Sequence, residues 1–225
     1  MFTLVCYGFV FEGERMSKRG RYHHGSLREA LMEAALRLVK EKGLRGFSLR
    51  EASREAGVAA SAPYRHFSDR GALMTAIAEE SVLMLMERTN KAMELVTEEN
   101  ALRQYQAMGV AYVKFAAEEP TRFLVMSDTE FADSSRSELL KQYEEQGEET
   151  IRRALSKAKE EESASALMNQ EMIQLAATAM TYGLAKMFAD GHFARAGVES
   201  EEAEGIAKMV TDILGAGIAN LSKGA

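Results

Sequence analysis

Several residue types are scarce in this chain of 225 residues. It has one cysteine (Cys6), two prolines, four histidines and no tryptophan. A single cysteine excludes a disulfide framework and a cysteine-based zinc site, and we expect neither a metal nor another cofactor. Few prolines beside long stretches of Ala, Leu, Glu, Lys and Arg favour a mostly helical protein. No apolar run approaches the ~18 residues that a membrane span needs, so we expect no membrane partner.

The short motifs that mark common enzyme classes are also missing. The sequence has no P-loop, no dinucleotide-binding fingerprint and no nucleophile elbow. The pair His23-His24 suggests a metal ligand, but no further cysteine or carboxylate cluster completes a site; the alternative is a helix lead-in that lies near nucleic acid. Paired carboxylates such as Glu148-Glu149 lie in charged runs typical of solvated helix faces. We therefore predict that the chain is not an enzyme.

Charge is distributed unevenly along the chain, whose net charge is −6. Residues 1–70 hold 13 Lys/Arg against 8 Asp/Glu, a net charge of +5, whereas residues 71–225 hold 15 against 26, a net charge of −11. A basic front on an acidic body is typical of a protein that binds nucleic acid with one end, because phosphate affinity depends on local positive charge. The alternative is chance patterning of solvated faces.

Residues 48–73 are the most informative stretch. Ser48 and Glu51 have the spacing of a capping box, in which each side chain accepts a hydrogen bond from the other residue's backbone amide. Gly57 can adopt the positive φ that ends such a helix. A second short helix is predicted over residues 60–66, with Phe67 as its apolar anchor. Two short helices joined by a glycine-containing turn predict a helix-turn-helix, whose second helix enters the DNA major groove.

Residues 26–73 resemble the N-terminal domain of the TetR/AcrR family of bacterial transcriptional regulators. Two positions depart from the family pattern: Ala59 replaces a Ser or Thr cap, for which Ser61 is a substitute, and Arg70 replaces a Lys. The missing cap costs about 1 kcal/mol of local stability. The residues that carry the resemblance are Ser48-Leu-Arg-Glu-Ala, Ala56-Gly57-Val58, Tyr64-Arg65-His66-Phe67, Arg70 and Leu73.

The resemblance implies an all-α fold, in which a three-helix helix-turn-helix domain is joined by a long helix to a C-terminal helical ligand-binding and dimerisation domain. We place the DNA-binding domain with its basic arm at residues 16–73 and the effector domain at residues 74–225. Residues 1–15 are interpreted as a mis-called start or a disordered extension. Apolar periodicity and capping signals predict helices over about 68–96, 101–118, 121–132, 136–161, 166–189 and 200–221.

Candidate DNA contacts divide into residues that position the domain and residues that read bases. Tyr64 has core packing as its alternative role. We expect Arg65→Ala to change sequence preference and Arg70→Ala to weaken binding to all duplexes alike. Phosphate or minor-groove contacts are predicted for Lys18, Arg19, Arg21, Arg28, Ser48, Tyr64, His66 and Arg70, and base contacts for Ala60, Ser61, Ala62 and Arg65.

The C-terminal half offers a candidate effector pocket and a candidate dimer interface. Its many methionines suit a permissive apolar pocket, although a methionine stripe is also typical of a core. The run Tyr182-Gly183-Leu184-Ala185 resembles a family subtype with a His/aromatic-Gly-Leu-Ala element. Small residues on the last two long helices allow close helix approach, either to a second subunit or within one chain. Predicted pocket residues are Tyr105, Tyr112, Phe115, Phe123, Met126, Met180 and Tyr182, and predicted interface residues are Ala176, Gly183, Met209, Ile213 and Gly217.

These features together predict a dimeric, sequence-specific transcriptional regulator. The resemblance implies a repressor that leaves an inverted-repeat double-stranded DNA operator when a small apolar or aromatic effector, of unknown identity, binds. We expect a cytoplasmic protein of a bacterium, associated with the nucleoid when bound to DNA. The alternative is a helical partner- or ligand-binding module with vestigial DNA binding, which the missing cap at Ala59 favours and the charge of Arg70 and the basic arm oppose.

Overall fold

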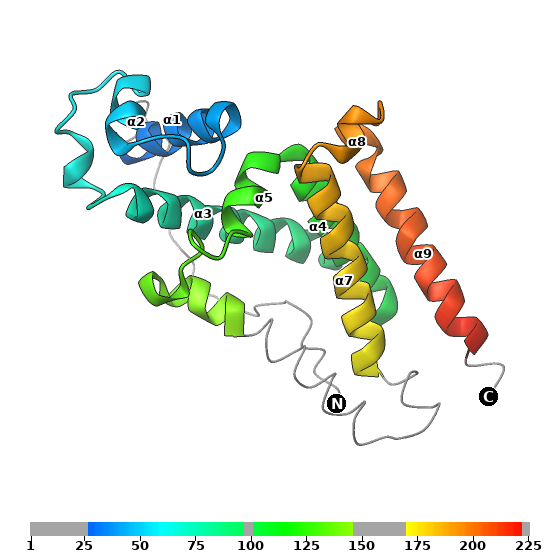
Figure 1. The fold of residues 1–225 in the computed structure, drawn as a ribbon. Helices are drawn as coiled ribbons and strands as arrows, with labels where there is room; N and C mark the ends of the chain where they lie inside the picture. Colours follow the sequence, from blue (N-terminus) through cyan, green and yellow to red (C-terminus); the bar gives the residue numbers. More distant parts are fainter. Residues whose placement is uncertain (1–26, 97–100, 146–169, 222–225) are drawn as a thin grey trace. The chain divides into compact units, whose positions relative to one another are not determined.

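The computed structural model describes residues 27–96, 101–145 and 170–221, and every regular element in these ranges is helical (Figure 1). The predicted all-α fold is therefore confirmed. None of the helices in this part of the chain combines the length and apolar character that crossing a bilayer requires. The elements are α1 (Leu27–Lys42), α2 (Leu49–Glu55), η1 (Pro63–Arg65), α3 (Arg70–Glu94), α4 (Ala101–Glu118), α5 (Pro120–Met126), η2 (Ser134–Arg136), α7 (Gln170–Ala189), α8 (His192–Arg195), η4 (Ser200–Glu202) and α9 (Ala203–Leu221), where η marks a 3-10 helix.

The described residues form two compact units, each of which is discontinuous in sequence. The N-terminal unit comprises residues 27–83 and 121–140, and the C-terminal unit comprises the described parts of 84–120 and 141–225. The chain does not divide into these units at the predicted boundary between residues 73 and 74. We call residues 121–140 the strap. It belongs to the N-terminal unit because it buries Phe123 and Phe131 there, with 0% and 2% of their surface exposed.

The entry to the helix-turn-helix has the structure that the sequence predicts. Ser48 Oγ accepts a hydrogen bond from the Glu51 amide at 3.2 Å, and Glu51 Oε2 accepts one from the Ser48 amide at 2.9 Å, so the capping box is confirmed. Gly57 has a φ of +70°, where a side chain would be strained. The Val58 amide donates to the Ser53 carbonyl at 2.9 Å, which closes α2 as a Schellman motif.

The second helix is shorter and tighter than predicted. Instead of an α-helix over residues 60–66, the chain makes a turn followed by the three-residue η1. Pro63 has no amide hydrogen to donate to a helical bond. Ala62 occupies the N-cap and no side chain caps η1, so the predicted substitute cap at Ser61 is wrong. The segment therefore forms only a short 3-10 helix, whose backbone hydrogen bonds join residues three apart.

The strap also differs from its predicted helices. The helix expected over 121–132 is α5, which ends at Met126. Asp128 Oδ1 accepts a hydrogen bond from the amide two residues later at 3.0 Å, and this local bond competes with continuation of the helix. The helix predicted from about residue 136 begins two residues later than expected. Ser137 Oγ accepts from the amide three residues later at 3.2 Å, where helical residues 138–145 begin.

The C-terminal unit is built on α4, which packs against both α7 and α9 (Figure 1). The α4–α7 contact is close because Gly109 carries no side chain: a Cβ there would lie 3.0 Å from Thr181 Cγ2. Polar bonds join α4 to α9, since Gln106 Nε2 donates to Asp212 Oδ1 at 2.7 Å and Lys114 Nζ to Glu204 Oε2 at 3.1 Å. Both α4 and α7 line the cavity described below, and α7 and α9 carry the apolar surface.

Candidate nucleic-acid interface and ligand cavity

Residues 59–66, which we call the reading segment, form an exposed stretch in the N-terminal unit. Pro63 is buried and Phe67, directly after the segment, is 4% exposed, so these two residues anchor it. Tyr64 is 54% exposed, and this exposure argues against the core role that the sequence left open. Arg65 is exposed and forms no ion pair with any described residue. The other exposed members of the segment are Ala59, Ala60, Ser61 and His66, and Ala62 is half-buried.

Ser48 and Arg28 are the other candidate contacts whose surroundings are described. Ser48 is exposed at the start of α2, but its hydroxyl and amide are occupied by the capping box. The Arg28 guanidinium lies 5.8 Å from the Phe67 ring centroid and 3.3 Å from Met32 Sδ. Both side chains therefore lie on the surface of the same unit as the reading segment. Lys18, Arg19 and Arg21, the basic arm, lie outside the described residues.

Glu51, which closes the capping box, has a strongly lowered pKa. The hydrogen bond from Lys42 Nζ at 2.8 Å and the bonds from Ser48 lower the pKa of Glu51 from 4.5 to about 2. Between about pH 2 and pH 4.5, this carboxylate is therefore charged in the folded state but protonated in the unfolded chain. By linkage, its contribution to stability is complete above about pH 4.5 and is lost as the pH falls toward 2.

A Glu51→Gln variant isolates this acid-sensitive contribution. Gln keeps the capping geometry but cannot be protonated in this range. We expect the melting temperature of wild type to fall more steeply between pH 5 and pH 2.5 than that of Glu51→Gln, as measured by circular dichroism. Glu41→Gln, at an exposed position of α1 without a described partner, is the control and should follow wild type. Parallel curves for all three proteins would contradict the assignment.

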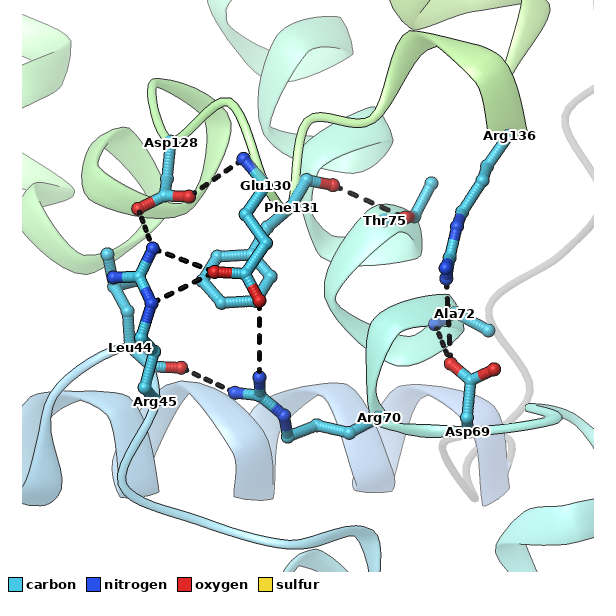
Figure 2. A network of polar contacts seen from close by, with 10 residues as sticks. All are labelled: Leu44, Arg45, Asp69, Arg70, Ala72, Thr75, Asp128, Glu130, Phe131 and Arg136. Atoms are coloured by element: carbon cyan, nitrogen blue, oxygen red, sulfur yellow. Dashed lines mark hydrogen bonds and ion pairs between the residues drawn. The ribbon is translucent and has the colours of Figure 1, made fainter.

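Arg70 lies in a network of contacts with other residues of the N-terminal unit (Figure 2). Its Nη1 donates to the Leu44 carbonyl at 2.7 Å, and its Nη2 lies 3.9 Å from Glu130 Oε1. The guanidinium lies 5.7 Å from the ring centroid of Phe47 and 5.0 Å from that of Phe131. Only 25% of the side chain is exposed. These contacts give Arg70 a role inside the unit, and its predicted phosphate contact gains no support from this placement.

Sequence reasoning did not identify Arg45, Asp128 and Glu130 as members of the same network. Arg45 Nε donates to Glu130 Oε2 at 2.9 Å, and Arg45 Nη2 lies 3.4 Å from Asp128 Oδ2 (Figure 2). Arg45 and Glu130 are 85 residues apart, and no local spacing links them. Their opposite charges were the only signal in the sequence.

The C-terminal unit contains a cavity of about 320 Å³ between α3, α4, α7 and helical residues 138–145. The described wall residues are apolar or carry hydroxyl groups, and none of these described residues is charged. The Thr89 hydroxyl in this wall donates to the Leu85 carbonyl at 3.0 Å, which leaves its oxygen free to accept. The wall residues are Leu85, Met86, Thr89, Met108, Gly109, Tyr112, Tyr143, Leu175, Thr178, Ala179, Thr181 and Tyr182.

Two of the predicted pocket residues, Tyr112 and Tyr182, line this cavity. The prediction differs from the structure at Phe115, which is 0% exposed and lies under the Arg88 guanidinium at 5.1 Å from its ring centroid. Three other predicted pocket residues do not line the cavity: Phe123 and Met126 are buried in the strap, and Met180 is half-buried on α7. The side chain of Tyr105 is not among the described ones. Helical periodicity predicts that a side chain is buried, but it does not separate a cavity wall from solid core.

An apolar surface is exposed on α7 and α9. Met209 is 60% exposed, Ile213 65%, Met187 45% and Tyr182 44%. Gly183 is exposed on α7, and a Cβ built there meets no atom within 4 Å. Large exposed apolar side chains on neighbouring helices mark an interaction surface. Ala176 is exposed as well, whereas the surroundings of Gly217 are not described.

Among the described residues, no group of three or more His, Cys, Asp or Glu side chains is arranged to hold a metal ion.

Comparison with known proteins places residues 31–77 in a family described as "Bacterial regulatory proteins, tetR family". An uncharacterized HTH-type transcriptional regulator of Haemophilus influenzae is 44% identical over 66 residues, which are 29% of this chain and 32% of that protein. The match therefore spans about a third of that relative's length.

Solved structures resemble the chain over most of its length. A Rhodococcus sp. RHA1 protein of unknown function is 31% identical with a TM-score of 0.60, over 87% of this chain and 97% of that one. A regulatory protein in the tetR family from Rhodococcus RHA1 is 17% identical with a TM-score of 0.60, over 85% and 96% of the two chains. At 17% identity, the second likeness shows the fold alone.

Proposed function

Because the chain belongs to the TetR family of bacterial regulatory proteins, we propose that it is a dimeric transcriptional repressor. In this proposal, the dimer binds an inverted-repeat operator and leaves it when a small effector binds. The family match is to regulatory proteins, in agreement with the prediction that the chain is not an enzyme. The more detailed subtype with the His/aromatic-Gly-Leu-Ala element stays a prediction.

The observation that supports DNA binding most directly is the surface of the reading segment. Its short side chains at Ala60 and Ser61 allow close approach to a base edge, and Arg65 beside them has no described anion to neutralise it. An exposed arginine with free donors can bond guanine O6 and N7 together. The capped α2 and the buried Phe67 hold this segment from both ends.

Selection of duplexes from a random pool with the purified protein, followed by anisotropy on the selected duplex at two salt concentrations, tests the proposal. An inverted repeat bound by a dimer supports it. Weak binding that ignores sequence and disappears with salt contradicts it, because that behaviour is purely electrostatic. The second outcome favours the alternative, a helical partner- or ligand-binding module, for which the 3-10 geometry after Ala59 is the supporting observation.

Arg65→Ala is expected to relax sequence preference at one base pair in each half-site. The loss in discrimination should be about 10-fold, corresponding to the 1–3 kcal/mol that a bidentate contact contributes. Arg50→Ala removes the same charge from an exposed position of α2 and is the control. We expect the control to weaken selected and unrelated duplexes by the same factor. Equal losses for both variants across all duplexes would overturn the base-reading role of Arg65.

The cavity in the C-terminal unit is the proposed effector site. Because none of its described wall residues is charged, these residues would not neutralise a carboxylate or an ammonium group, and burying an unpaired charge is costly. We therefore propose a neutral effector with an apolar or aromatic body and few polar groups. It would act by population shift, since it binds one conformation better than another and weakens operator binding by the coupling free energy, typically 1–3 kcal/mol. The selected duplex would serve as the reporter in effector screening.

The exposed apolar surface of α7 and α9 is the proposed dimer interface. Two half-sites in an inverted repeat require two copies of the chain, and a two-fold dimer presents the same surface from each. Met209 and Ile213 would be covered by the partner, and the open space at Gly183 would admit a partner helix. A cytoplasmic protein that associates with the nucleoid on operator binding completes the proposal.

A further inference from the structure

We propose that Glu130 of the strap is a positioning residue for DNA binding, which acts by holding Arg45 and Arg70 at the same time. The inference rests on the proposed function, because its effect appears in operator recognition. Arg45 precedes α2, and Arg70 is the first residue of α3. The two arginines therefore flank the helix-turn-helix at its entry and its exit, and one carboxylate joins them.

Each oxygen of Glu130 faces a different arginine (Figure 2). Oε2 accepts from Arg45 Nε at 2.9 Å and lies 2.8 Å from Arg45 Nη2, and Oε1 lies 3.9 Å from Arg70 Nη2. Asp128 adds a second acceptor for Arg45 at 3.4 Å. Arg70 in turn donates to the Leu44 carbonyl, in the residue next to Arg45, at 2.7 Å. The contacts close a ring that includes both flanks of the helix-turn-helix.

Phe131, the residue after Glu130, lies between the same two arginines. The Arg45 guanidinium is 5.4 Å from its ring centroid and that of Arg70 is 5.0 Å away. The buried Thr75 donates its hydroxyl hydrogen to the Phe131 carbonyl at 3.2 Å, which binds the strap to α3 (Figure 2). With 2% of its surface exposed, Phe131 fixes where the Glu130 carboxylate lies.

The strap has other attachments to the N-terminal unit that do not involve Glu130. Arg122, 11% exposed, pairs with Glu33 of α1 at 3.2 Å and with Glu80 of α3 at 2.9 Å. Arg136 lies 3.6 Å from Asp69. These bonds remain when Glu130 is changed, so loss of its carboxylate should alter the geometry of the helix-turn-helix rather than unfold it. An exposed ion pair contributes little to stability on its own.

Charge alone predicts the opposite result from positioning. Glu130 adds a negative charge to a unit that binds phosphates, so its removal should raise affinity for every duplex if the residue has no other role. If Glu130 positions the helix-turn-helix, Glu130→Gln should instead lower affinity for the operator while affinity for unrelated duplexes rises slightly. The ratio of the two affinities, the specificity ratio, therefore separates the two roles.

The experiment compares wild type, Glu130→Gln and Glu79→Gln on the selected operator and a scrambled duplex by anisotropy. Glu79 is a residue of α3 in the same unit that forms no ion pair with the described residues, so its variant removes the same charge. We expect the specificity ratio to fall about 10-fold in Glu130→Gln, within the range of couplings between contacting residues, and to stay unchanged in Glu79→Gln. The melting temperature should change little in either variant.

A double-variant cycle tests whether Glu130 acts through Arg45. Arg45→Gln should lower the specificity ratio, and adding Glu130→Gln to it should lower the ratio little further, because the shared contact is already lost. If Glu130→Gln proves unfolded, Arg45→Gln tests the same contact. This variant should fold, because 62% of the Arg45 side chain is exposed. Specificity ratios equal to wild type in Glu130→Gln or, where it is unfolded, in Arg45→Gln would overturn the inference. Absence of any specific duplex for wild type would instead overturn the proposed function.

Discussion

Ile213→Glu is expected to convert the proposed dimer into a monomer and to abolish tight operator binding. The side chain is 65% exposed in the single chain, so the monomer tolerates the charge, whereas a dimer would bury it against apolar groups without a partner. A monomer binds one half-site at a time and loses the effective concentration that linkage provides. We expect operator affinity to fall about 100-fold or more. Sedimentation velocity measures the oligomeric state, and anisotropy measures the affinity.

Leu83→Glu is the matched control for this prediction. Leu83 is 52% exposed on α3 and lies outside the α7 and α9 surface, so the variant adds the same charge to another exposed apolar position. It should remain a dimer and keep its operator affinity within a few-fold. Gly183→Leu adds a second probe, because its Cβ meets no atom within 4 Å in the single chain and only a partner would exclude it. A dimeric Ile213→Glu protein would show that the interface lies elsewhere.

Local signals in the sequence predict local structure well in this chain. The Ser48–Glu51 capping box and the turn at Gly57 form as their spacing indicates, because each depends on hydrogen bonds between residues at most five apart. The same reasoning failed at residues 60–66. There, Pro63 and the absence of a side-chain cap on η1 favour a 3-10 helix over the predicted α-helix. The two helical forms differ too little in free energy over so few residues for residue spacing to predict which one forms.

Long-range contacts account for most of what the sequence did not predict. Arg70 was interpreted from its position in the family pattern as a phosphate contact, but its partners include Glu130 and Phe131 in a strap that follows much later in the chain. An arginine that follows a helix-turn-helix looks the same in sequence whether it faces a phosphate or a carboxylate. Only the fold decides, by placing an anion within reach.

The cavity shows a second limit of prediction from the sequence. Tyr112 and Phe115 are three residues apart on α4, and both are aromatic residues on the buried side of an amphipathic helix. Tyr112 lines the cavity, whereas Phe115 packs beneath Arg88. The difference depends on whether a side chain from another helix fills the adjacent space, as Arg88 of α3 does at Phe115, and no periodicity within α4 contains that information.

Phe115→Ala should accordingly reduce stability strongly. A fully buried phenylalanine that is truncated to alanine leaves a cavity and costs about 3–5 kcal/mol. For a chain of this size the melting temperature should fall by about 10 °C. Leu95→Ala, at a leucine that is 74% exposed, is the control and should change stability by less than about 0.5 kcal/mol. Thermal and urea unfolding of both variants measure the difference.

Phe115→Ala also decides between the predicted and the observed role of this residue. A wall residue of a ligand cavity already borders empty space, so its truncation enlarges a cavity that exists and removes fewer packing contacts. A core residue loses contacts on every side. Phe115 is 0% exposed, does not line the 320 Å³ cavity and is covered by a guanidinium held by Glu118 at 2.6 Å. A loss of unfolding free energy below about 1 kcal/mol would indicate that Phe115 is a cavity wall residue, and a loss near 4 kcal/mol would indicate a core residue.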